Sequence, residues 1–357
     1  WAPTREMIDA VERFDPDGEA LVIGSFLATT PHLCGRPLLA HRRAEWVALE
    51  DKVVIDAFWD RAGIARRPSV VVPLPEAVEA SETIDRGRGT VWAGDAREGF
   101  HGGARHTYWV ADQASRKRAL ASLRPASDIV RVMPFVEGVP CSVHGIVLPD
   151  GVAVLRPVEM VTLRRGFELV YAGCATYWDP TAEIREQVRS TARRAGELLR
   201  DELDFRGTFT VDGVVDEDGF WPTELNPRFG AGIMTIARGA GIPMVLVNDL
   251  IVAGHDIGCS ASELESAVVT HGDRDRGGGP WMGSLGVETA MVDRPVSFTD
   301  GTWSWATDDD IVAGHVTAGG GFVRCVYNAR TTPIGPSTGD LAAAFWEFAA
   351  DELDTDT

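Results

Sequence analysis

The chain of 357 residues is 45% hydrophobic and 24% charged, which is typical of a globular protein with two or three domains and excludes a disordered or fibrous class. A net charge of −19 makes most of the surface repel phosphate groups, so nucleic acid and anionic membranes are not expected as partners. The sequence contains no apolar run of the ~20 residues that a membrane span needs. The N-terminus has no signal-peptide pattern and starts at Trp1 without Met, so upstream residues are expected to be missing or removed.

The five cysteines are dispersed and form no CxxC pair, which predicts a reducing, cytoplasmic location. His32, Cys34 and His41 come closest to a zinc site, but their spacing matches no zinc motif. A structural role is therefore favoured for these three residues.

Residues 1–45 predict a short α/β segment at the N-terminus. It contains a helix over Thr4–Phe14, a turn, and a buried strand over Ala20–Phe26. The strand ends at Gly24-Ser25, but no GxGxxG pattern follows, so packing is favoured over nucleotide binding.

A helix is predicted from Trp46, because Val53, Phe58 and Ala62 recur at helical spacing before a terminating glycine. Lys52 falls in its first turn, where a positive charge opposes the helix dipole. This position predicts an anionic partner, either a neighbouring surface carboxylate or a ligand phosphate.

Residues 69–125 predict an α/β unit with a glycine-rich loop at residues 98–104 between two strands. Such a loop brings backbone N–H groups close to phosphate oxygens, although an ordinary hairpin has the same composition. Strands are then predicted at 129–135, 141–148 and 152–161, and a long helix over Thr181–Leu203. Arg156 and Glu159 lie on the third of these strands, either as a surface ion pair or pointing into a cleft.

The segment Gly207–Gly230 predicts a β-hairpin that carries a metal site. If Val215 faces Trp221 across the turn, Asp212 lies opposite Glu224, and Asn226 shares the face of Glu224. Two carboxylates and an amide oxygen suit Mg²⁺, which binds few protein oxygens and fills its shell with water and phosphate. The alternative is a solvated hairpin edge, and a register slip of one residue would separate the two carboxylates.

After the hairpin, helices are predicted over Ile233–Ala240 and Pro243–Ala253, and Arg238 is a candidate ligand for a substrate carboxylate. From about Ser260 the sequence becomes rich in glycine and β-forming residues before a last helix over Thr338–Leu353. This change predicts a separate small α+β domain.

Glu224-Leu225-Asn226-Pro227-Arg228, preceded by Asp212, resembles the metal-binding signature of the ATP-grasp superfamily. The resemblance covers residues 46–256 and implies an ATP-grasp fold whose two α+β lobes, about 46–128 and 129–256, hold ATP between them. It makes residues 1–45 a short preceding α/β segment and residues 257–357 a C-terminal α+β domain.

The resemblance also implies roles for the residues of the motif. Asp212, Glu224 and Asn226 would hold Mg²⁺, with Mn²⁺ as an alternative, and Arg228 would steady the transferred phosphoryl group or the acyl-phosphate.

Further implied roles concern the nucleotide. Lys52 would contact phosphate, and the loop with Gly102 and Gly103 would close over the triphosphate. The strand before this loop carries no lysine, in contrast to the family, so Arg105 or Arg97 is expected to supply that charge.

The base of ATP would lie in the segment between the lobes. Met133, Phe135 and Val136 would flank the adenine, and Glu137 would bind the ribose, although Glu137 can equally well begin a turn.

The implied function is an ATP-dependent ligase that activates a small-molecule carboxylate, such as an amino acid or peptide, as an acyl-phosphate and joins it to an amine. Such enzymes release ADP and phosphate. Carboxylation, phosphorylation without ligation, and nucleotide binding without catalysis are the alternatives, the last because of the absent lysine. Neither substrate is identified, and a homodimer stays open.

Overall fold

The computed structural model describes residues 3–95, 97, 102, 104–283 and 291–353. The helices are α1 (Arg5–Phe14), α2 (Ala44–Val47), η1 (Ala48–Glu50), α3 (Ile55–Arg61), η2 (Leu74–Glu76), α4 (Ala77–Ile84), α5 (Gln113–Leu123), α6 (Ala182–Leu203), α7 (Ala231–Ala237), η3 (Arg238–Ala240), α8 (Met244–Val252), α9 (Ala261–Arg274) and α10 (Gly339–Leu353). The strands are β1 (His32–Leu33), β2 (Arg36–Pro37), β3 (Val70–Pro73), β4 (Thr90–Gly94), β5 (Thr107–Val110), β6 (Ile129–Pro134), β7 (Val139–Leu148), β8 (Gly151–Arg165), β9 (Glu168–Ala175), β10 (Gly207–Asp216), β11 (Gly219–Asn226), β12 (Gly278–Gly283), β13 (Val292–Thr299), β14 (Thr302–Trp305), β15 (Val312–Gly319) and β16 (Phe322–Tyr327).

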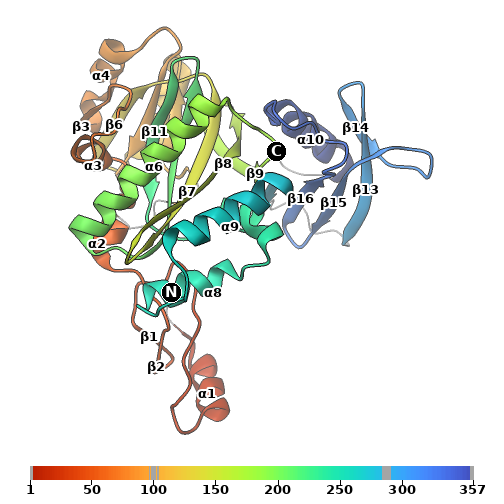
Figure 1. Cartoon of the computed structure of the whole chain (residues 1–357). Helices are drawn as coiled ribbons and strands as arrows, with labels where there is room; N and C mark the ends of the chain where they lie inside the picture. The colour runs from red at the N-terminus through yellow and green to blue at the C-terminus, as the bar shows by residue number, and fades with distance from the viewer. Residues whose placement is uncertain (1–2, 96, 98–101, 103, 284–290, 354–357) are drawn as a thin grey trace.

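One large antiparallel sheet organises the molecule (Figure 1). Its main path is β11-β10-β7-β8-β9-β12-β16-β15-β13-β14. The strands β3 to β6 join this path through β5, which pairs with β9 at Tyr108 and Glu168. The predicted α/β class, with strands and helices mixed, is confirmed.

The strands β3 to β6 form a small lobe whose sheet has two different faces. Trp92, Val130 and Val132 point to one face and pack with Leu123 of α5 in a buried core. Because side chains alternate along a strand, Arg131 points to the opposite face. This second face is therefore the one available to the rest of the protein.

The two faces of the central strands are also covered differently. The helices α3 and α6 pack on the face that carries Val143 and Val211. The helices α7, α8 and α9 pack on parts of the face that carries Ile146 and Val158. The metal motif lies on this second face, because Ser142 and Asp212 alternate with the residues of the first core.

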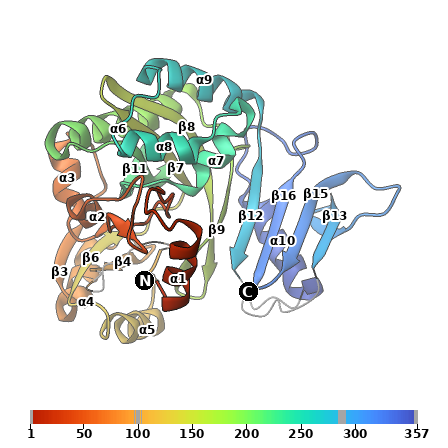
Figure 2. The same cartoon turned by 90° about the horizontal axis from the view of Figure 1, so that it is seen from below.

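The C-terminal strands continue the sheet, because β12 pairs with both β9 and β16. The helix α10 packs Phe345 and Ala349 against these strands, and Figure 2 shows this unit at one side of the molecule. The strand β9 and the helix α9 are among the elements that were not predicted from the sequence. The helix α9 follows the predicted boundary at residue 256 but packs Leu264 and Val268 with residues of β8.

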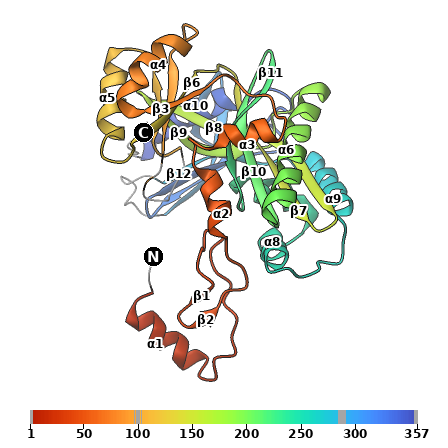
Figure 3. The ribbon, with the colours of Figure 1, turned by 90° about the vertical axis from the view of Figure 1, so that its left-hand side faces the viewer.

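The N-terminal arm, defined as residues 3–43, extends away from the sheet in Figures 1 and 3. The helix α1 begins after Thr4, as predicted, but the predicted buried strand over Ala20–Phe26 is wrong. This stretch makes one isolated bridge, Val22 to Leu38, and Leu21 and Ile23 are 52% and 62% exposed. The segment has the composition of a strand but no sheet beside it to pair with.

The helix predicted from Trp46 is broken into α2, η1 and α3. The side chain of Asp51 accepts a hydrogen bond from the backbone N–H of Val53 at 3.1 Å, a local bond that competes with helix formation. Lys52 therefore lies in a turn, and the prediction that it occupies a first helical turn is wrong. The end of α3 is as expected, since Gly63 has a left-handed φ of 62°.

The helices α7 and α8 follow the metal motif and meet at a sharp angle. Among the described residues, no single helix has the length and apolar character to cross a membrane. The pair Ala231–Ala240 and Met244–Val252, bent by 114°, meets the criteria of length and composition only when both helices are taken together.

Candidate active site

The hairpin of β10 and β11 brings Asp212 opposite Glu224, as predicted. The assumed register was wrong by one residue, because Val215 faces Phe220 and not Trp221. A β-bulge after Asp212 leaves Thr223 as an extra residue and restores the expected pair. Gly213 makes this bulge feasible, because a Cβ there would lie 2.4 Å from a backbone oxygen.

Asp212 lies partly buried at the centre of the motif. One carboxylate oxygen accepts a hydrogen bond from Ser142 Oγ, and the other accepts one from Asn226 Nδ2 at 2.9 Å. Burial, together with the neighbouring Glu224 charge, raises the pKa of Asp212 to about 7. Two carboxylates on adjacent strands need a compensating proton or cation, so this pair is suited to bind a metal ion.

Lys52 is buried beside these acids, with Nζ 3.6 Å from Glu224 Oε2. The sequence left open a surface lysine paired with a neighbouring carboxylate, and the observed burial excludes the surface position. Lys52 comes from the turn before α3 and Glu224 from β11, so two distant segments meet here.

A second cation, Arg228, follows the metal motif directly. Its Nε donates to Glu50 Oε1 at 3.1 Å, and its Nη2 donates to Asn226 Oδ1 at 3.0 Å. Glu50 is buried, with 4% of its surface exposed, and also accepts a hydrogen bond from Arg42 Nη1. Neither Glu50 nor Arg42 was a candidate from the sequence.

Arg131 is a further cation that the sequence analysis missed. Its Nη2 lies 2.6 Å from Asp56 Oδ1, and its Nη1 donates to the carbonyl oxygen of Thr223 at 2.9 Å. Burial lowers the pKa of Arg131, and the Asp56 charge opposes this effect. The residue links the small lobe to the strand of Glu224. An arginine within the apolar strand Ile129–Pro134 was the available signal.

His144 lies on the neighbouring strand β7, two residues after Ser142, which is paired with Asp212. Its Nδ1 shares a hydrogen bond of 2.9 Å with Thr210 Oγ1, and burial lowers the pKa of His144 to about 3. Gly230 and Gly232 pack directly on the ring, because a Cβ at either position would lie within 2.7 Å of an imidazole atom. The alternation of Ser142 and His144 within a buried strand was a signal for polar residues on the motif face.

The predicted base-binding segment lies where β6 leads into β7. The ring of Phe135 lies 5.1 Å from that of Trp109, and its backbone N–H donates to the Gly89 carbonyl. Met133 pairs with Val91 across β4 and β6, on the same face as Arg131.

The side chain of Glu137, which follows this segment, is exposed. Glu137 forms an ion pair of 3.1 Å with Arg88, so binding a ribose would compete with that contact. Val136 lies beside it in the connection to β7. The nucleotide-binding roles of Glu137 and Val136 stay predictions.

The glycine-rich loop is described only in part, and Gly103 with residues 98–101 lies outside the described residues. The carbonyl of Gly102 accepts a hydrogen bond from Arg105 N at 3.4 Å. Arg97 is held at the start of β6, where its Nη1 donates to Asp128 Oδ2 at 3.1 Å. Burial raises the pKa of the Tyr108 hydroxyl on β5, and a hydrogen bond with Ser122 and, to a smaller extent, the positive charge of Arg105 partly offset this.

Arg156 and Glu159 are buried, so the surface ion pair considered for them is wrong. Arg156 Nη1 donates to the Gly272 carbonyl at 3.2 Å. Glu159 Oε2 accepts two hydrogen bonds of 2.8 Å from Thr338. Their polar atoms connect β8 to α9 and to the start of α10. These contacts do not support the alternative that the two side chains point into a cleft. The third substrate candidate, Arg238, pairs with an aspartate of the following segment, Asp275, at 3.0 Å.

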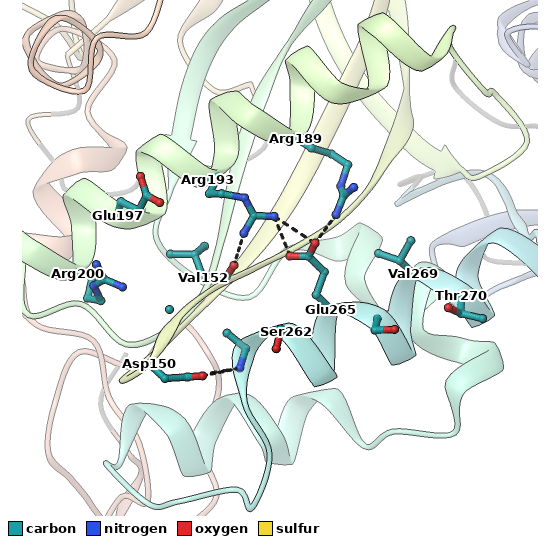
Figure 4. Close-up of a pocket in the computed structure, with 13 residues that line it drawn as sticks. Asp150, Val152, Arg189, Arg193, Glu197, Arg200, Ser262, Glu265, Val269 and Thr270 are labelled. Atoms are coloured by element: carbon teal, nitrogen blue, oxygen red, sulfur yellow. Dashed lines mark hydrogen bonds and ion pairs between the residues drawn. The ribbon is translucent and has the colours of Figure 1, made fainter.

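A cavity of about 650 Å³ lies elsewhere, between α6 and α9. Figure 4 shows Glu265 at its wall, held by Arg189 and Arg193. These three residues, named here the α6–α9 clasp, also bond the backbone of β8: Glu265 accepts from Val154 N, and the arginines donate to the carbonyls of Val152 and Val154. The clasp covers a stretch of β8 that pairs only with β7.

The donor set of the motif fits a hard divalent cation. Within the described residues, no group of three or more His, Cys, Asp and Glu side chains is arranged to hold a metal ion. The motif instead offers two carboxylates and the amide oxygen of Asn226, a set that leaves several positions for water and phosphate oxygens. Such sites are typical of Mg²⁺.

Comparisons with known proteins concern the domain and the fold that carry this site. Residues 99–232 match the sequence profile of the ATP-grasp domain, and no curated protein sequence matches the chain. An N5-carboxyaminoimidazole ribonucleotide synthetase in its ADP complex superposes with a TM-score of 0.57 at 12% identity, over 99% of this chain and 86% of the other.

Two further solved structures have the same fold. Phosphoribosylamine–glycine ligase from Thermotoga maritima gives a TM-score of 0.54 at 16% identity, over 83% of this chain and 75% of the other. L-amino acid ligase from Bacillus licheniformis gives 0.54 at 15% identity, over 85% and 71%. At these identities the likeness concerns the fold alone.

Proposed function

We propose that this chain, whose residues 99–232 match the ATP-grasp domain, is an ATP-dependent ligase that joins a small-molecule carboxylate, such as an amino acid or peptide, to an amine. In this reaction the carboxylate oxygen attacks the γ-phosphorus of ATP, which gives an acyl-phosphate and ADP. The amine then attacks the acyl carbon, loses a proton, and releases phosphate. The protein needs no nucleophilic side chain, since ATP supplies the activation.

The observation that carries this proposal is the convergence of two acids and two cations at the hairpin. Asp212 and Glu224 face each other, Lys52 lies 3.6 Å from Glu224, and Arg228 is held by the adjacent Asn226. In the transition state of phosphoryl transfer, negative charge develops on the oxygens around the transferred phosphorus. Fixed cations next to those oxygens lower the activation free energy.

Each group has a separate task in the proposed reaction. Asp212, Glu224 and Asn226 would hold Mg²⁺, which when bound neutralises charge on the phosphate oxygens. Lys52 would bind a phosphate of ATP, and Arg228 would bind the transferred phosphoryl group. To do so, Lys52 exchanges its contact with Glu224 for a phosphate oxygen. Mn²⁺ can replace Mg²⁺ in such an oxygen set.

The small lobe would supply the rest of the nucleotide site. Met133 and Phe135 would contact the adenine, and Glu137 would bind the ribose after releasing Arg88. Arg105 would bind the phosphates from the glycine-rich loop. Arg97 is the weaker candidate, because Asp128 and two carbonyl groups already hold it.

The experiment is a screen of pairs of amino acids and other carboxylates and amines for ADP release, with mass detection of products. The expected result is ADP release that requires both partners and a product whose mass is their sum less water. ADP release that depends on bicarbonate indicates carboxylation, and release with carboxylate alone indicates phosphorylation. Tight ATP binding with no turnover across the panel would contradict the proposal and favour a nucleotide-binding protein.

A further inference from the structure

We propose that Glu50 is a positioning residue for the reaction: it fixes the guanidinium of Arg228 so that this group can face the transferred phosphoryl. This inference rests on the proposed function. Glu50 acts through Arg228, whose Nε donates to its carboxylate at 3.1 Å.

The contacts form a continuous chain across the site. Arg42 and Arg228 donate to Glu50, Arg228 donates to Asn226 Oδ1, and Asn226 Nδ2 donates to Asp212. Arginine has only donors, so the amide oxygen of Asn226 must point toward Arg228. The oxygen expected to bind a metal ion is therefore engaged by Nη2 of Arg228.

This arrangement predicts an exchange of partners. When Asn226 gives its oxygen to a metal ion, Arg228 loses one of its two anchors, and the bond from Nε to Glu50 is the other. A guanidinium held by Nε alone still presents both terminal nitrogens in a fixed plane, which is the geometry that suits two phosphoryl oxygens.

The charges of the trio support this role. Arg42 and Arg228 together carry two positive charges against the single negative charge of Glu50, so the trio keeps one net positive charge for an anionic ligand. Glu50 is buried, and the partner side chains of Arg42 and Arg228 are 11% and 17% exposed. Loss of the carboxylate would leave two poorly solvated guanidinium groups without their shared acceptor.

The N-terminal arm holds Glu50 in place. The backbone N–H of Arg42 donates to the Ala28 carbonyl at 2.7 Å. This bond within the arm fixes the backbone of Arg42, whose side chain donates to Glu50. The arm also touches the residue after Arg228, since the rings of Phe26 and Phe229 lie 5.9 Å apart. The arm is therefore linked to the Arg228 segment twice, through Glu50 and at Phe229.

The test is Glu50→Gln, which keeps the shape of the side chain and removes its charge. With a substrate pair found by the screen, we expect kcat to fall about 30-fold and KM for ATP to change less than about threefold, since the lost contact acts at the transition state. Glu50→Asp keeps the charge and should give an intermediate kcat. A structural role alone would not produce this split or this partial rescue.

A double-mutant cycle identifies the residue through which Glu50 acts. In an Arg228→Ala background, Glu50→Gln should change kcat less than about twofold, because the group that it positions is absent. Glu265→Gln is the matched control, since Glu265 also binds two arginines but lies in the α6–α9 clasp. It should leave kcat unchanged at a temperature where both variants are folded.

A binding experiment gives a readout without turnover. Calorimetry should show that Glu50→Gln binds MgADP with the affinity of the wild type. It should bind MgADP together with fluoroaluminate, which mimics the phosphoryl group in the transition state, about tenfold less tightly than the wild type does. Full kcat in Glu50→Gln, equal losses in the two backgrounds, or unchanged fluoroaluminate affinity would each overturn the inference. Absence of ADP release by the wild type with every substrate would instead contradict the proposed function.

Discussion

Glu50 and Glu265 each hold two arginines, but their other partners differ. Glu265 in the α6–α9 clasp also accepts from the backbone N–H of Val154, and its arginines donate to backbone carbonyls of β8. Glu50 in the candidate site accepts from side chains, and its partner Arg228 leads on to Asn226 and the metal motif.

This difference indicates how each cluster is used. Backbone groups of a strand have no other hydrogen-bond partner once they are buried, so the clasp cannot release them without loss of stability. Side-chain partners in the site can be exchanged for a ligand, because a metal ion or phosphate compensates each contact that is lost. The clasp is therefore expected to act in stability and the Glu50 cluster in turnover.

The largest effect is expected at the metal motif. Glu224→Ala and Asn226→Ala should each lower ADP formation by about 10³-fold, since each removes a ligand of the proposed cation. The melting temperature should change little, because both side chains make polar contacts within the motif and neither contributes apolar packing to a core. Asp212→Asn should be milder, because one ligand oxygen survives. Wild-type rates in the first two variants would contradict the metal assignment.

The opposite result is expected in the clasp. Glu265→Ala should lower the free energy of unfolding by about 3 kcal/mol, because it leaves two arginines and a backbone N–H without their acceptor. Urea unfolding measures this, with steady-state kcat below the transition as the second readout. A large loss of kcat with an unchanged free energy of unfolding would mean that the clasp takes part in turnover. The distinction between the clasp and the Glu50 cluster would then be wrong.

The sequence predicted the parts that depend on local pattern. The turn signals and the alternation around residues 208–226 defined the hairpin, and the bulge at Thr223 happened to restore the carboxylate pair despite an assumed register that was off by one. Glu50 could not be found in this way, because it meets Arg228 across 178 residues and nothing in its neighbourhood marks that contact.

Other misses had a usable signal. The helix α9 begins with a capping box, in which Ser260 and Glu263 bond each other's backbone, and this pattern is readable in the sequence. The apolar stretch Ala20–Phe26 had the right composition for a strand, but a strand also needs a neighbour, and that depends on the tertiary fold.

A smaller effect is expected for the cation that replaces the absent lysine. Arg105→Ala should weaken ATP binding or turnover at least ~10-fold, about 1.4 kcal/mol, because a closed loop strengthens the interaction of a cation with phosphate. Lys117→Ala, on the exposed side of α5, is the control and should change little. If Arg97→Ala loses activity and Arg105→Ala does not, Arg97 is the phosphate ligand, and its bond to Asp128 must open on binding.

The smallest effect concerns His144, a buried polar residue of the site whose side chain is expected to stay neutral. Its pKa of about 3 in the folded protein lies below the ordinary value of 6.5, so the folded state binds fewer protons than the unfolded state between these values. Burial of the neutral ring therefore makes its full contribution to the free energy of unfolding above pH 6.5. This contribution is lost as the pH falls from 6.5 toward 3. His144→Asn can keep the hydrogen bond to Thr210 but cannot take up a proton. From pH 7.5 to pH 6, we expect the wild type to lose under about 1 kcal/mol of unfolding free energy relative to this variant. If the unfolding free energies of the two proteins changed equally with pH, the His144 ring would be solvated or paired with an acid. The side of the site around His144 would then be accessible to water.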